Sequence, residues 1–114
     1  QFVDLHTAFE RAANLAAKTE SVVYNEECFV QADREFFKAL SHLKETVPQA
    51  LEDGLYRAAL TALAEFREPV DRFFDQVMIM DKDEKVRQNR LSMLLETATV
   101  FRTFADFQAI VVSL

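Results

Sequence analysis

Basic side chains gather in one stretch of an otherwise acidic chain. The 114 residues include 13 Lys and Arg against 19 Asp and Glu, a formal net charge of −6, yet residues 85–103 hold four basic residues and one acidic residue. Arg87 and Arg90 are three residues apart, so on a helix they share one face. Guanidinium groups bind phosphate oxygens and base edges through paired hydrogen bonds. With Lys82 and Lys85 nearby, this stretch is the candidate contact for a polyanion.

The same two arginines have an alternative role in ion pairs. The face shared by Arg87 and Arg90 becomes apolar from Leu94 onward, and a charge on a buried face needs a partner. Asp71 or Asp75 of the preceding helix would supply the carboxylate. The residues alone leave both roles open.

No set of residues suited to catalysis is present in the sequence. His6 and His42 fall on different helices, and the chain has no H-E-x-x-H zinc motif, no G-x-S-x-G nucleophile motif and no phosphate-binding glycine loop. The single Cys28 is interpreted as a half-buried structural residue. The acidic cluster at residues 81–84 lacks the glycine and the spaced glutamate of a calcium loop. Helix capping explains this cluster, so no metal site is predicted.

Composition favours one all-α domain. Half of the residues are hydrophobic, and the chain has one Gly and two Pro, which excludes disorder and argues against a sheet built from several hairpins. No apolar run exceeds four residues, so no membrane span is expected. A single cysteine fits a reducing, cytoplasmic compartment. Because the chain begins with Gln1 rather than Met, we expect it to be a piece of a longer protein.

Hydrophobic spacing divides the chain into four to six helices that pack as a bundle. Pro48 should kink or interrupt the second helix and Gly54 should end it, whereas Pro69 should open a new short helix. Asp81 or Asp83 should cap the last helix. The expected helices cover residues 2–17, a stretch from 26–31 to Gly54, residues 55–66, a short piece from residue 68 and residues 84–112, with residues 18–25 as a connection.

Phenylalanine accounts for 11 of the 13 aromatic residues, and many of these recur at helical spacing, which predicts a phenylalanine-rich core. Phe104 and Phe107 fall to one side of the last helix, so they are expected to be partly exposed and able to meet another domain. This supports an alternative function, a protein-interaction bundle that docks on the rest of a longer chain or on a second copy.

A longer pattern carries a family resemblance. Residues 67–95 read REPVDRFFDQVMIMDKDEKVRQNRLSMLL, and this run resembles the C-terminal end of the β subunit of bacterial heterotetrameric glycyl-tRNA synthetase. The matching positions are Pro69-Val70-Asp71, Phe73-Phe74-Asp75, Val77, Met80, Asp83, Arg87, Asn89-Arg90-Leu91, Leu94 and Ala105-Asp106.

The resemblance implies that residues 1–114 form one all-α anticodon-binding domain, DALR-like and similar to the domain that ends arginyl-tRNA synthetase. The parent ligase joins glycine to tRNA(Gly) with ATP and magnesium, and its catalytic core is on the α subunit. This fragment would then be non-catalytic and hold no cofactor. The implied partners are tRNA(Gly), the α subunit and the remaining β-subunit domains, with no DNA and no membrane.

The resemblance also extends the set of candidate residues. Asn89 would either read a base or lie on the helix surface. The candidates for RNA binding are Arg87, Arg90, Lys82, Lys85, Asn89, Arg67 and Arg72. The candidates for structural ion pairs with arginines are Asp71, Asp75 and Asp106.

Overall fold

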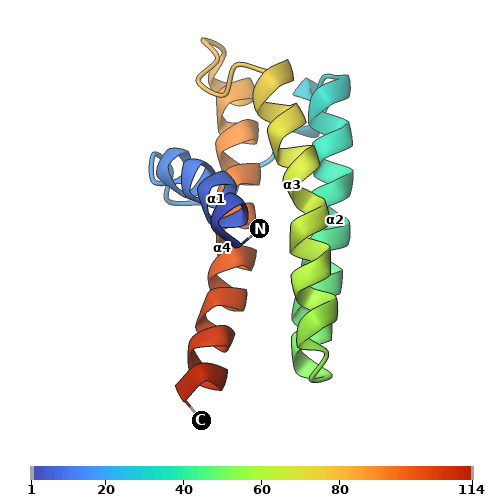
Figure 1. Cartoon of the computed structure of the whole chain (residues 1–114). Coiled ribbons are helices and arrows are strands. Elements are labelled where there is room, and N and C mark those ends of the chain that lie inside the picture. The colour runs from blue at the N-terminus through green and yellow to red at the C-terminus, as the bar shows by residue number, and fades with distance from the viewer. Residues whose placement is uncertain (1, 114) are drawn as a thin grey trace.

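The chain folds as a helical bundle (Figure 1). The computed structural model describes the backbone of residues 2–113 and the side chains of residues 7 and 9–109, so the side chain of His6 lies outside the described residues. Within this part the chain has no strand, which confirms the all-α prediction, and no helix is long and apolar enough to span a membrane. The elements are α1 (Phe2–Ala16), the 3-10 turn η1 (Glu26–Cys28), α2 (Gln31–Glu52), α3 (Tyr56–Gln76) and α4 (Glu84–Ser113).

The long helix α4 is the element around which the others are arranged. α2 and α3 form an antiparallel hairpin that lies beside α4, and α1 crosses α4 on another side (Figure 1). The bundle measures 47 × 24 × 22 Å, so its long axis is about the length of the 30-residue α4. Because α4 is covered by α1, α2 and η1, it is apolar around much of its circumference.

A glycine ends α2 as the sequence predicts. Gly54 has a φ of +75°, a value that residues with a Cβ rarely adopt. The Leu55 N–H donates to the Ala50 carbonyl at 2.7 Å, and the Gly54 N–H donates to the Leu51 carbonyl at 3.1 Å. These two bonds occupy carbonyl groups that the end of the helix leaves without partners, and they turn the chain back into α3.

Both prolines lie inside helices, which corrects two expectations. α2 continues through Pro48 without interruption, and α3 continues through Pro69, so no new helix begins at residue 68. A proline inside a helix costs about 3 kcal/mol. The turn after Pro69 buries Val70 and Phe73 almost completely, and burial of each such side chain is worth about 1.5–3 kcal/mol. Packing therefore outweighs the lost hydrogen bond.

Phenylalanine rings fill the core, as predicted. Phe36 of α2 stacks on Phe73 of α3 with ring centroids 4.3 Å apart, and Phe9 of α1 stacks on Phe101 of α4 at 4.6 Å. Phe9 also stacks on Phe66 of α3 at 6.2 Å. These stacks join all four helices through one aromatic cluster.

The expectation for Phe104 is wrong. This side chain is fully buried, because Tyr56 at the start of α3 stacks on it with centroids 5.1 Å apart. Phe107 is half-buried and stacks on the same tyrosine, with ring centroids 6.2 Å apart. The two rings on that side of α4 therefore hold the end of the hairpin, and Phe104 offers no surface to another domain.

Candidate nucleic-acid interface

The connection between α3 and α4, residues 77–83, is called the α3–α4 loop here, and a carboxylate sets where it ends. Asp83 Oδ1 accepts the N–H groups of Lys85 at 2.9 Å and Val86 at 3.1 Å, which makes Asp83 the predicted cap of α4. Asp81 Oδ1 accepts the Asp83 N–H at 2.9 Å. The acidic cluster is thus used in capping, and the described residues contain no group of acidic, His or Cys side chains able to hold a metal ion.

Arg87 folds back onto the α3–α4 loop. Its Nη1 donates to the Asp81 carbonyl at 2.9 Å and lies 3.4 Å from the Lys82 carbonyl. The side chain is half-buried. One arginine in the first turn of α4 therefore holds two carbonyl groups of the loop that precedes the helix.

Arg90 is buried in an ion pair, but its partner is not the predicted one. Its Nε donates to Asp33 Oδ1 at 3.0 Å, its Nη2 lies 3.4 Å from Asp33 Oδ2, and its Nη1 donates to the Met78 carbonyl at 2.7 Å. Arg90 is 5% exposed and Asp33 is fully buried. Asp81 lies near the same guanidinium, 3.7 Å from Nη1. The arginine ties α4 to α2 and to the α3–α4 loop.

The predicted pairing of Arg90 with Asp71 or Asp75 is therefore wrong. Asp71 faces outward and lies 3.6 Å from Arg67, one turn earlier on the same helix, and Asp75 is also exposed. Asp33, the true partner, has a signal in the sequence. It falls at helical spacing between the buried Phe29, Phe36 and Leu40, and a carboxylate in an apolar stripe needs a cation.

Asn89 is buried rather than placed on the helix surface. Its Oδ1 accepts the Asn25 N–H at 2.6 Å, and its Nδ2 donates to the Asn25 carbonyl at 2.9 Å. Ser92 repeats this arrangement one turn later, because its Oγ accepts the Val23 N–H at 2.9 Å and donates to the Val23 carbonyl at 3.0 Å. Side chains of α4 thus satisfy the backbone of the connection at residues 17–25, a structural role that sequence reasoning missed.

A polar cluster fastens the same connection further along α4. Tyr24 donates its hydroxyl to Glu96 Oε1 at 2.5 Å, and Lys44 of α2 contacts Glu96 Oε2 at 2.5 Å. Burial raises the pKa of Tyr24, and the hydrogen bond to Glu96 raises it further. Cys28 of η1 is half-buried, as predicted.

The remaining candidates lie on exposed surfaces. Lys82, in the α3–α4 loop, and Lys85, in the first turn of α4, are exposed. Arg67 and Arg72 are exposed on α3, where Arg72 contacts Glu68 at 2.5 Å. Asp106 is exposed on α4, and its pairing with an arginine stays a prediction.

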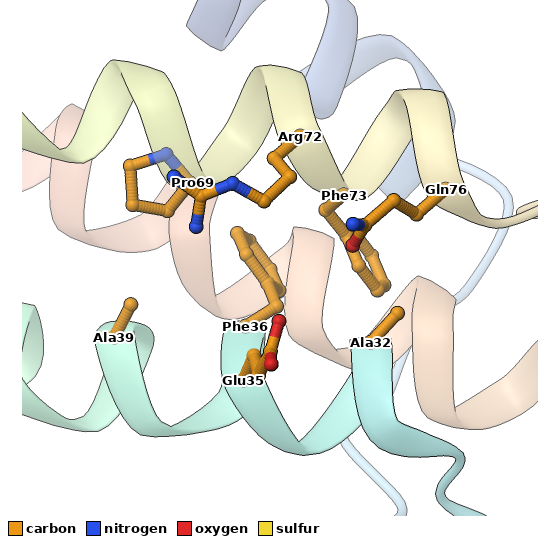
Figure 2. A pocket seen from close by; sticks show the side chains of 8 residues that line it. All are labelled: Ala32, Glu35, Phe36, Ala39, Pro69, Arg72, Phe73 and Gln76. Carbon is orange, nitrogen blue, oxygen red and sulfur yellow. The ribbon is translucent and has the colours of Figure 1, made fainter.

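Two hollows lie between α2 and α3. The first, shown in Figure 2, has a volume of about 40 Å³ beside the stacked Phe36 and Phe73, and Glu35 and Arg72 also line it. That volume holds water but not a nucleobase. The second encloses about 390 Å³ and is lined mainly by small and apolar side chains.

A comparison with protein families assigns the chain. Residues 5–109 match the family described as the DALR anticodon binding domain. The chain belongs to this DALR family. No solved structure gives a significant match to it.

Three curated relatives of this DALR domain carry the name glycine–tRNA ligase beta subunit. The chain is 42% identical to that of Desulforudis audaxviator over 92% of its own length and 15% of the relative. It is 39% identical to that of Citrifermentans bemidjiense, covering 93% of the chain and 16% of the relative. It is 38% identical to that of Moorella thermoacetica, covering 96% of the chain and 16% of the relative. The DALR domain thus spans about one-sixth of these relatives.

The geometry divides the candidate residues of the DALR domain into two groups. Lys82, Lys85 and Arg87 lie together at the N-terminal end of α4 and are called the basic tip here. Arg90 and Asn89 lie beneath it, and their polar atoms are bound within the protein. In the basic tip Lys82 and Lys85 are thus exposed and Arg87 is half-buried, whereas Arg90 and Asn89 are buried.

Proposed function

We propose that this domain binds the anticodon arm of tRNA(Gly) as a module of glycine–tRNA ligase. The observation that carries the proposal is the family match over residues 5–109. The name shared by the curated relatives supports it. The remaining β-subunit domains and the α subunit would attach glycine with ATP and magnesium in the cytoplasm. This domain would position the tRNA and take no part in the chemistry.

The basic tip is the proposed contact with the phosphates of the anticodon arm. Lys82 and Lys85 are exposed and project from the loop and from the first turn of α4. Arg87 would add to their charge while it holds the loop carbonyls. Arg67 and Arg72 would contribute from α3 at longer range. Phosphate contacts of this kind fix the orientation of the RNA rather than read its sequence.

A titration of tRNA(Gly) against the whole chain at several salt concentrations tests the proposal. We expect weak binding at low salt that falls as salt rises, because each phosphate contact releases counterions. Replacing Lys82 and Lys85 with alanine should lower the slope of log K against log salt. A matched control replaces Lys18 and Lys38, which are exposed elsewhere and carry the same charge. Absence of binding at low salt would contradict the function.

A second candidate function is docking against other domains of a longer chain. The hollow of about 390 Å³ between α2 and α3 favours it, because Ala58, Ala62 and Leu43 leave an apolar floor between the two helices. Static light scattering distinguishes docking on a second copy: a stable dimer at micromolar concentration would support self-association, and a monomer would exclude it.

A further inference from the structure

We infer that Met78 and Met80 are base-contacting residues, which lie against the faces of unpaired nucleotides while Lys82 and Lys85 contact the flanking phosphates. The inference rests on the proposed RNA-binding function and goes beyond it by assigning the apolar part of the contact. Its ligand class is a single-stranded RNA loop.

The two methionines are held outward by the residue between them. Met78 is 68% exposed and Met80 is 45% exposed, whereas Ile79 is 7% exposed and packs into the core. The chain turns at Ile79 and Met80, and the burial of Ile79 leaves the side chains on both sides of it exposed. Met78 is the most exposed of the large hydrophobic side chains in the described part of the chain.

The backbone under these methionines is fixed before any ligand arrives. Arg90 Nη1 binds the Met78 carbonyl at 2.7 Å, and Arg87 Nη1 binds the Asp81 carbonyl at 2.9 Å. The carbonyl group of Lys82 also lies near Arg87. Three carbonyl groups of the α3–α4 loop thus contact two arginines of α4. A loop held in one conformation loses little entropy on binding. Arg87 and Arg90 act here as positioning residues.

The two lysines beside the methionines and the family match favour RNA over an apolar protein surface. The carboxylates of Asp81 and Asp83 are directed at backbone N–H groups of the loop and of the first turn. The exposed side chains that follow the methionines are Lys82, Asp83, Glu84 and Lys85, two of each sign. Apolar side chains, methionine among them, insert beside unstacked bases, and every base offers a face for such contact. A surface of apolar side chains next to lysines therefore fits unpaired nucleotides.

The test compares two RNA probes by fluorescence anisotropy with the whole chain. One probe is an anticodon stem-loop of tRNA(Gly), and the other is a fully paired duplex of the same length. Replacing Met78 and Met80 with alanine should weaken stem-loop binding about five- to tenfold, at the lower end of the effect of removing a stacking side chain. The salt slope should not change, and duplex binding should stay the same.

Three controls separate base contact from other causes. Replacing Lys82 and Lys85 with alanine should lower the salt slope by about 1.4, the value for two phosphates of a single strand. Replacing Val22 and Val23, which are 43% and 46% exposed on another loop, should leave binding unchanged. The melting temperature of the methionine variant should match that of the unchanged chain, because both side chains are exposed.

The outcomes distinguish the inference from the function on which it rests. If the unchanged chain binds neither probe, the proposed function fails and the inference fails with it. If the chain binds the stem-loop and the Met78→Ala/Met80→Ala variant binds it equally well, the inference alone is overturned. If that variant keeps RNA binding but loses self-association in light scattering, the methionines form a protein contact, and the inference is likewise overturned. Selective loss of stem-loop binding supports it.

Discussion

Removing Asp33 should destabilise the fold more than removing any exposed carboxylate. Asp33 is fully buried, and it accepts hydrogen bonds from Arg90 and from the Val30 N–H at 3.0 Å. In Asp33→Ala, the Arg90 guanidinium keeps its hydrogen bond to the Met78 carbonyl, and the Asp81 carboxylate stays 3.7 Å from Nη1. The Arg90 Nε loses its hydrogen-bond partner. A buried charge that loses its partner costs about 3–5 kcal/mol in the free energy of unfolding.

The expected shift in melting temperature follows from the length of the chain. Unfolding entropy is about 2.1 cal/mol/K per residue, or roughly 240 cal/mol/K for this chain, so 1 kcal/mol moves the midpoint by about 4 °C. Asp33→Ala should therefore melt about 12–20 °C below the unchanged chain. The matched control is Asp71→Ala, which removes an exposed pair with Arg67 and should cost at most about 0.5 kcal/mol.

Urea denaturation followed by circular dichroism measures both variants. A double variant, Asp33→Leu with Arg90→Met, should recover much of the loss, because apolar residues of similar volume replace a buried ion pair well. The reasoning is refuted if Asp33→Ala loses less than about 1 kcal/mol. It is refuted equally if Asp33→Ala and Asp71→Ala lose the same amount.

Two further predictions concern the connection at residues 17–25. Burial and the Glu96 hydrogen bond raise the pKa of Tyr24 above its ordinary value near 10, so above pH 10 this tyrosine ionises first in the unfolded chain and the free energy of unfolding falls as the pH rises. Urea denaturation measures the free energy of unfolding of the unchanged chain and of Tyr24→Phe. The difference between the two should therefore shrink above pH 10, and a constant difference would contradict this. Asn89→Ala should cost about 1–3 kcal/mol and speed hydrogen exchange at the Asn25 amide, with exposed Asn14→Ala as the control, and unchanged protection of that amide would count against it.

Features that depend on neighbours along the chain could be predicted from the sequence. Gly54 ends α2 and Asp83 caps α4 because each acts on backbone groups within a few residues. The prolines show the limit of such reasoning. Whether a helix continues through Pro48 or Pro69 depends on how the next turn packs against another helix, and local propensity does not contain that information.

The candidate site shows the same limit over longer distances. Periodicity places Arg90 on a buried face, but its partner Asp33 lies 57 residues earlier. The apolar stripe around Asp33 indicates that this carboxylate needs a cation, but it does not indicate which one. Asn89 looks like a surface residue because polar side chains usually face water. It is buried because the backbone that it satisfies belongs to a connection 64 residues away. Lys82 and Lys85 are exposed as local polarity predicts, but which ligand they meet is a property of the missing partner.

The fastening of residues 17–25 by α4 has a consequence for the order of events during synthesis. The α4 side chains that bind Val23, Tyr24 and Asn25 come 64–72 residues later in the chain. At roughly 5–20 residues per second, the ribosome needs about 3–14 s to make them. The α2–α3 hairpin is complete before α4 exists, so it is the first unit able to form. The connection at residues 17–25 is thus made before the hairpin but fixed in place after it, and Asp33 stays without its arginine until α4 is made.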